Sequence, residues 1–170
     1  ELLEGEALQT RLDRGRIPLD DALDIVDQIA RGLDAAHAAG IVHRDLKPDN
    51  VWLQRVGNEP RPIAKLLDLG LAKLALHRRS EETAVNVMFG TPKYMSPEQC
   101  QSARDVGPPT DVYALGCVAF ELLCGRLPFV YDNLAELVVA HGSEPPPTPR
   151  SLNPTIPLAL DALLTGMLAK

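Results

Sequence analysis

The stretch HRDLKPDN, residues 43–50, decides the fold of this chain and carries most of its chemistry. It lies between two short apolar segments, and a second acid, Asp68, follows Asn50 by 18 residues (68 − 50) at the end of a third apolar segment. Short apolar segments bounded by turn residues predict β-strands. We therefore expect Asp45, Asn50 and Asp68 to lie around two short strands.

These residue types point to phosphoryl transfer. Asn and Asp oxygens are hard ligands of the kind Mg²⁺ prefers, and Mg²⁺ is usually held by one or two protein groups together with substrate phosphates. A carboxylate that does not bind metal can orient a hydroxyl and accept its proton. Lys47 would add positive charge where the phosphoryl group transfers. A single Asp in a loop is more often a turn residue, and we expect only that role for Asp49.

Three further motifs follow in order: DLG at residues 68–70, GTPKYMSPEQ at 90–99 and DVYALG at 111–116. Together with HRDLKPDN, this order resembles the catalytic lobe of a eukaryotic-like (bacterial Hanks-type) serine/threonine protein kinase. The MSPEQ ending is most similar to bacterial members. The resemblance covers residues 1–170. It implies an α+β, protein-kinase-like fold with a mainly helical C-lobe and short β-strands around the catalytic loop.

The resemblance also implies roles for the residues of the catalytic loop. Asp45 matches the catalytic base, and Lys47 matches the residue that steadies the transferring phosphate. Asn50 and Asp68 match the positions that hold magnesium. The implied reaction is transfer of a phosphoryl group from ATP, with Mg²⁺, to serine or threonine hydroxyls of protein substrates.

Four nucleotide contacts are implied as well. Residues 1–3 resemble the hinge whose backbone meets adenine, which involves Glu1 and Leu3. Glu6 falls where ribose is often contacted, with a solvated helix residue as the alternative. Leu53 is expected at the floor of the adenine pocket, and Trp52 is expected to pack rather than to bind.

The activation segment would run over residues 68–98. Arg44 matches the arginine that pairs with a phosphate on this segment, with Thr83 as the first candidate acceptor and Ser80 as the second. Thr91 is expected to help position the peptide substrate. Structural roles are implied for His43, Gly70, Glu98 and Asp111.

The ends of the chain resemble an interrupted domain. No glycine-rich phosphate loop or strand lysine precedes Glu1, and the arginine that should pair with Glu98 is expected beyond Lys170. We interpret the chain as a partial kinase domain that lacks the N-lobe and is inactive alone. An unpaired buried carboxylate is costly, so we expect loose folding near the C-terminal end.

The amino-acid composition argues against several other classes of protein. The chain has 170 residues, 45% of them hydrophobic, and a formal net charge of −6. An acidic chain is a poor nucleic-acid binder, and no apolar run is long enough to span a bilayer. Three cysteines without CxxC spacing favour a reducing, cytoplasmic location. A dimer formed through the absent N-lobe is possible on the same resemblance.

Periodicity predicts mostly helices. Apolar residues from Leu19 onward recur at helical spacing up to Gly40, and residues 112–124 are apolar nearly all round, which predicts a buried central helix capped by Thr110 or Asp111. Further predictions are a short helix over 6–14, a strand over 63–67, a helix over 134–140, an extended connector over 145–149 and a helix from Pro157.

Two other functions share part of the motif set. A small-molecule phosphotransferase of kinase-like fold would have the same acids, but the 30-residue span from Asp68 to Glu98 (98 − 68) and the presence of Lys47 favour a peptide substrate. A pseudokinase or interaction module is disfavoured because Asp45, Lys47, Asn50 and Asp68 are all intact.

Overall fold

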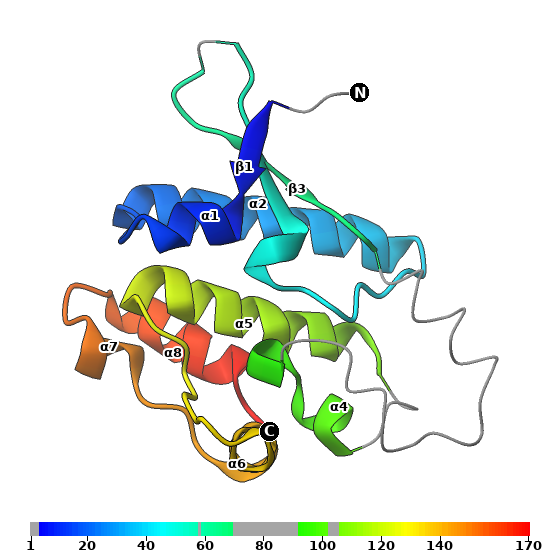
Figure 1. The fold of residues 1–170 in the computed structure, drawn as a ribbon, viewed down its shortest axis with the longest axis vertical. Coiled ribbons are helices and arrows are strands. Elements are labelled where there is room, and N and C mark those ends of the chain that lie inside the picture. Colours follow the sequence, from blue (N-terminus) through cyan, green and yellow to red (C-terminus); the bar gives the residue numbers. More distant parts are fainter. Residues whose placement is uncertain (1–3, 58, 70–91, 102–105) are drawn as a thin grey trace.

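The computed structural model describes residues 4–57, 59–69, 92–101 and 106–170, and it has two parts stacked on each other (Figure 1). A three-stranded sheet with α1 and α2 forms one part, and helices around α5 form the other. The elements, in chain order, are β1 (Gly5–Ala7), α1 (Leu8–Asp13), α2 (Leu19–Ala38), η1 (Pro48–Asn50), β2 (Val51–Gln54), β3 (Ile63–Leu66), η2 (Pro92–Tyr94), α4 (Pro97–Gln101), α5 (Pro108–Cys124), α6 (Leu134–Ser143), α7 (Pro149–Leu152) and α8 (Leu158–Met167).

The sheet is antiparallel throughout, with strand order β1-β2-β3. Gly5 lies opposite Gln54, and Val51 lies opposite Leu66. Only glycine fits at position 5, because a Cβ there would come within 2.1 Å of the Leu53 carbonyl oxygen. Because β2 and β3 are antiparallel, the residue before β2, Asn50, lies next to the residue after β3, Leu67, and the catalytic loop therefore meets the segment that carries Asp68.

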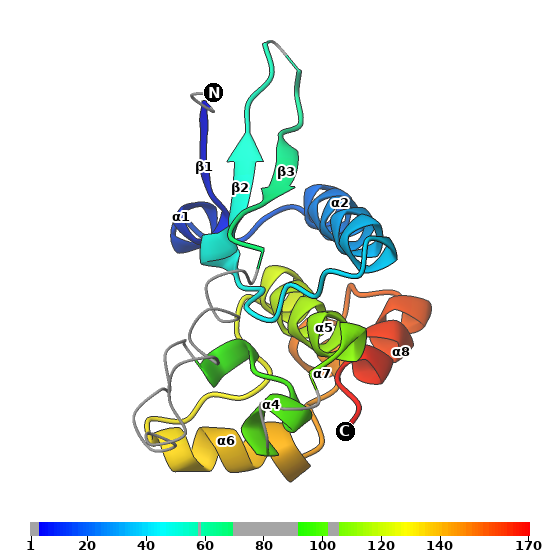
Figure 2. The same ribbon diagram turned by 90° about the vertical axis from the view of Figure 1, so that its right-hand side faces the viewer.

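Two long helices form the core between the parts. The buried residues of α2 recur at spacings of three and four, which is the pattern of one helix face. Helix α5 is buried on almost all sides after its first residues, as its composition predicted, although Val112 is 43% exposed. Figure 2 shows α5 below α2, with the three strands to the left of α2. The buried face of α2 comprises Ala22, Ile25, Ile29, Leu33 and Ala36.

Two expectations for the second part were wrong. Helix α5 begins at Pro108 after an N-cap at Gly107, so Thr110 and Asp111 lie within its first turn rather than at its cap. Their side chains make other bonds, as described below. The proline-rich stretch is extended only up to Thr148, because Pro149 begins the short helix α7, a position where its missing N–H costs nothing.

The C-terminal end is packed rather than loose. Leu164 and Leu168 are 1% and 0% exposed, and a Cβ on Gly116 of α5 would meet Met167 at 3.0 Å. The expectation of loose folding there was therefore wrong. No described helix combines the length and the apolar character that crossing a membrane requires.

His141 of α6 is a buried titratable group in this part. It is fully shielded from solvent, its Nδ1 lies 2.9 Å from the Tyr113 hydroxyl, and its ring meets Phe129 edge-on. Burial first, and the nearby Lys170 ammonium second, lower the pKa of His141 to about 4.

We predict that His141 makes the fold acid-sensitive. Because its pKa falls from 6.5 in the unfolded chain to about 4 in the fold, protonation favours unfolding. The stability that depends on neutral His141 is complete above pH 6.5 and is lost as the pH falls toward 4, by up to about 3 kcal/mol. Urea titrations of wild type and His141→Gln across this range should converge at low pH. A constant difference between the two would refute the prediction.

Candidate active site

The backbone of the catalytic loop, residues 43–50, is hydrogen-bonded to one buried carboxylate. Asp111, in the first turn of α5, is 0% exposed and accepts hydrogen bonds from the backbone N–H groups of His43 and Arg44, both at 2.8 Å. Its Oδ2 also lies 2.7 Å from Nε2 of His37 on α2. One side chain thus connects both core helices to the loop.

The loop backbone is held in an uncommon conformation at this point. Arg44 has φ = 65°, which non-glycine residues adopt only at a cost of about 1–3 kcal/mol when the surroundings impose it. Gln99 of α4 supplies a further constraint, because its Nε2 donates to the Arg44 carbonyl at 2.8 Å. His43 is fully buried below the loop, and its Nδ1 accepts a long bond of 3.4 Å from the Asp45 N–H.

Three polar side chains, those of Asp45, Lys47 and Asn50, lie close together in the part of the loop that follows Arg44. Asn50 Nδ2 donates to the Asp45 carbonyl at 2.8 Å and to Asp45 Oδ2 at 3.3 Å. Lys47 Nζ lies 3.4 Å from the same Oδ2. The short helix η1 produces this convergence, because the Asn50 N–H bonds back to the Lys47 carbonyl at 2.9 Å. The sequence-predicted base, cation and amide are therefore neighbours.

Asp68 follows β3, the strand that pairs with β2. The Leu67 N–H donates to the Asn50 carbonyl at 2.8 Å, which extends the β2–β3 pairing by one step. Asp68 follows directly, exposed and with φ = 52°. Arg44 and Asp68 are the two described non-glycine residues with a left-handed backbone conformation.

The side chains at this site suit Mg²⁺ better than a metal ion that binds to protein side chains alone. In the part of the chain that the structure describes, no group of three or more His, Cys, Asp or Glu side chains could hold a metal ion. Magnesium needs fewer protein ligands, since it keeps waters and substrate phosphates. The Asn50 amide nitrogen is directed to Asp45, which leaves the amide oxygen as the Asn50 atom with the chemistry to bind a cation.

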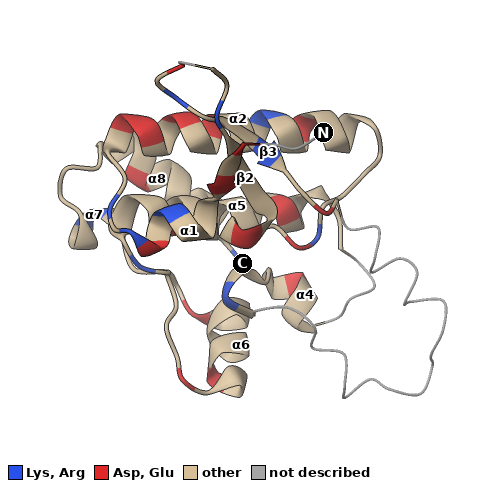
Figure 3. Ribbon diagram, turned by 45° about the horizontal axis from the view of Figure 1, so that its top comes forward, with Lys and Arg blue, Asp and Glu red and all other residues tan. Residues whose placement is uncertain are grey.

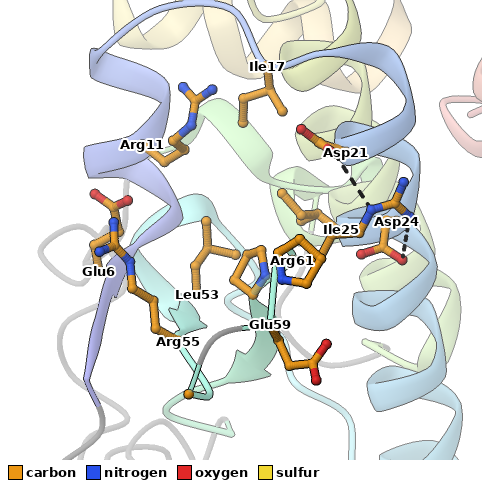
Figure 4. Close-up of a pocket in the computed structure, with 13 residues that line it drawn as sticks. Glu6, Arg11, Ile17, Asp21, Asp24, Ile25, Leu53, Arg55, Glu59 and Arg61 are labelled. Atoms are coloured by element: carbon orange, nitrogen blue, oxygen red, sulfur yellow. Dashed lines mark ion pairs between the residues drawn. The ribbon is translucent and has the colours of Figure 1, made fainter.

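The two nucleotide candidates within the described residues lie on one face of the sheet. Glu6 and Leu53 are directly opposite each other in the β1–β2 register. Leu53 is 4% exposed and belongs to the core, and the Glu6 carboxylate pairs with the Arg14 guanidinium. Both residues line a cavity of about 480 Å³ between α1, α2 and the β2–β3 connection (Figure 4). No residue of the catalytic loop lines this cavity.

Trp52 lies on the opposite face of β2, where it is opposite Ala7 and Lys65. It is partly exposed, and its indole Nε1 has no hydrogen-bond partner among the described residues. The sequence analysis expected Trp52 to pack rather than to bind, although the two-residue alternation of a strand already separates Trp52 from its neighbours Val51 and Leu53.

Glu98 differs from expectation. Its side chain is partly exposed rather than buried, and the Thr110 hydroxyl donates to its carboxylate. Thr110 in turn accepts a bond from the Ser96 hydroxyl at 3.3 Å. The expectation of a buried carboxylate without a partner was therefore wrong. The remaining candidates lie outside the described residues: Glu1, Leu3, Gly70, Ser80, Thr83 and Thr91.

This arrangement is that of a phosphotransferase catalytic lobe, and comparison with known proteins identifies the family. Residues 1–169 match the protein kinase domain. The chain is 47% identical over 148 residues to the serine/threonine-protein kinase Pkn1 of Myxococcus xanthus, which covers 87% of this chain and 21% of that protein. It is 39% identical over 158 residues to PknA of Mycobacterium tuberculosis, covering 92% and 35% of the two chains.

A probable serine/threonine-protein kinase PknB of Lactococcus lactis is 37% identical over 172 residues, covering all of this chain and 26% of that protein. The chain belongs to the protein kinase family, whose members generally use ATP and Mg²⁺. It spans between about a fifth and a third of the length of these relatives.

We predict that Asp111→Asn destabilises the fold more than an exposed substitution of the same type. The amide nitrogen cannot accept, so at least one of the His43 and Arg44 bonds is lost within a buried site, at a cost of about 1–3 kcal/mol. Asp34→Asn is the matched control, because Asp34 is exposed on α2. Equal urea midpoints for the two variants would contradict the role of Asp111.

Proposed function

We propose that the full-length protein phosphorylates serine and threonine hydroxyls of protein substrates with ATP. The observation that supports this most is the convergence on Asp45, whose carboxylate lies 3.3 Å from Asn50 Nδ2 and 3.4 Å from Lys47 Nζ. The family match and the names of the relatives agree with this chemistry.

Each residue contributes a separate function in this proposal. Asp45 orients the acceptor hydroxyl and takes its proton, and the bond from Asn50 fixes the direction of the carboxylate. Lys47 keeps positive charge beside the transferring phosphoryl group. Asn50 and Asp68 would hold Mg²⁺, which when bound neutralises charge on the phosphates of ATP.

Regulation by the activation segment is part of the proposal. Arg44 Nε is buried and has no hydrogen-bond partner among the described residues. A phosphate on Thr83 or Ser80 would give this guanidinium a charge-assisted partner. Thr91 is proposed to position the substrate peptide. A cytoplasmic location remains a proposal, supported by the free thiols of the cysteines.

We also propose that Trp52, rather than Leu53, faces the nucleotide base. Leu53 is 4% exposed and lines a cavity that no residue of the catalytic loop lines, whereas Trp52 lies partly exposed on the other face of the same strand. An aromatic ring provides a large flat surface for a planar base. Glu6, which shares the face of Leu53 and pairs with Arg14, is then a structural residue.

We predict that Asp45→Asn in the full-length protein abolishes transfer of phosphate from Mg·ATP to a generic acceptor such as casein. General-base catalysis contributes about 10²–10⁴-fold, so kcat should fall by at least the lower figure while folding is unchanged. Exposed Asp20→Asn is the control. Wild-type activity in the Asp45 variant would defeat the assignment of the base.

A second prediction separates the two faces of β2. Trp52→Ala should raise the KM for ATP about tenfold, equivalent to about 1.4 kcal/mol, with a smaller change in kcat. Leu53→Val should lower the unfolding free energy by about 0.5–1.5 kcal/mol and leave the KM unchanged. The reverse pattern would restore Leu53 as the adenine contact.

A further inference from the structure

The cavity between α1, α2 and the β2–β3 connection has no part in the proposed phosphoryl transfer. Its volume of about 480 Å³ is that of a small-molecule site, and no residue of the catalytic loop lines it. Its floor is apolar, because Ile17, Ile25 and Leu53 line it from three separate parts of the chain. An apolar floor with a few charged groups around it is typical of a site that binds a small molecule.

Arg11 provides a fixed positive charge on the α1 side of this cavity (Figure 4). Its guanidinium donates to the carbonyl oxygens of Gly15 at 3.1 Å and Arg16 at 3.4 Å, just after the end of α1. A guanidinium has five N–H donors, so others remain for a ligand. Among the described residues, neither Arg11 nor Arg55, which lines the same side, has a carboxylate partner. This side of the cavity therefore suits a carboxylate.

The α2 side of the cavity carries an excess of negative charge. Asp21 and Asp24, which belong to the acids along α2 in Figure 3, both lie 3.8 Å from the single guanidinium of Arg61. Both contacts are longer than hydrogen bonds, and the Arg61 and Asp21 side chains are 54% and 50% exposed, so water weakens the pairing. Figure 4 shows this group across the cavity from Arg11. Two carboxylates that share one guanidinium suit an ammonium group.

Two further acids line the cavity without favouring a different ligand. The Glu6 carboxylate already pairs with the Arg14 guanidinium. Glu59 is an exposed residue of the β2–β3 connection, where water and salt screen its charge. Strand β2 separates the cavity from the face that carries Trp52, because Leu53 and Trp52 lie on opposite faces of the strand. A ligand in the cavity would therefore leave the proposed nucleotide face open.

We propose that this cavity binds a small dipolar molecule, of about dipeptide size, with an apolar body between a carboxylate and an ammonium group. The carboxylate binds Arg11, and the ammonium group binds Asp21 and Asp24. The apolar body covers Leu53 and Ile25. The interior of a protein segment fits less well, because its backbone carries no charge for either side. This site is separate from the proposed phosphoryl transfer and does not depend on it.

The test is isothermal titration calorimetry of the full-length protein with the dipeptide Leu-Leu and two analogues that each lack one charge. Leu-Leu amide has no carboxylate, and N-acetyl-Leu-Leu has no ammonium group. We expect a Kd of about 100 μM for Leu-Leu and roughly tenfold weaker binding of each analogue.

Two variants assign the charges to their partners. Arg11→Gln should weaken the binding of Leu-Leu roughly tenfold and leave that of Leu-Leu amide unchanged, since the amide has no carboxylate for Arg11 to bind. Asp21→Asn should have the same effect on Leu-Leu and leave N-acetyl-Leu-Leu unchanged. Unchanged binding of the matching analogue also shows that each variant is folded. Arg31→Gln is the control, because Arg31 is exposed on α2 and does not line the cavity.

The proposal is overturned if Leu-Leu does not bind, if either analogue binds equally well, or if Arg11→Gln binds Leu-Leu as the wild type does. Equal binding of N-acetyl-Leu-Leu amide, which has neither charge, would overturn it in favour of a protein segment. Displacement of Leu-Leu by Mg·ATP would identify the cavity with the nucleotide site and would also overturn it. Absence of kinase activity would count against the proposed function and leave the binding result intact.

Discussion

The carboxylate of Asp111 is the constraint on which the site depends. It accepts two backbone N–H groups of the catalytic loop and contacts His37, while it is itself removed from solvent. An ionised group in such a position is stable only when its oxygens are satisfied by hydrogen bonds. The loop therefore cannot leave α5 without exposing an unsatisfied carboxylate, and this holds Arg44 at a positive φ.

From that anchor the remaining geometry follows step by step. The turn of η1 brings Asn50 and Lys47 to Asp45, and the pairing of β2 with β3 brings Leu67, the residue before Asp68, to Asn50. The polar groups come from two local segments, whereas the Asp111 carboxylate and the Gln99 amide that hold the loop backbone come from elsewhere in the chain. The catalytic loop is thus a short-range structure with long-range support from two side chains.

Sequence reasoning predicted the long helices, two of the three described strands and the residues that meet at Asp45, because periodicity and ordered motifs are local signals, but it placed Glu6 and Ala7 in a helix where the structure has strand β1. It failed where a side chain had a distant partner. Thr110 and Asp111 resembled helix caps, but their bonds go to Glu98 and to the loop. Loose packing was expected near the C-terminal end because no partner for Glu98 was visible, although Thr110 lies only 12 residues away. The face on which Trp52 lies depends on strand register, which the motif alone does not specify.

The most direct test of this account is amide hydrogen exchange at His43 and Arg44, measured residue by residue. If Asp111 holds the loop, both N–H groups should exchange as slowly as the core amides of α5, although they belong to no helix or strand. Exchange at the rate of an unstructured chain would show that the buried carboxylate does not support the catalytic loop.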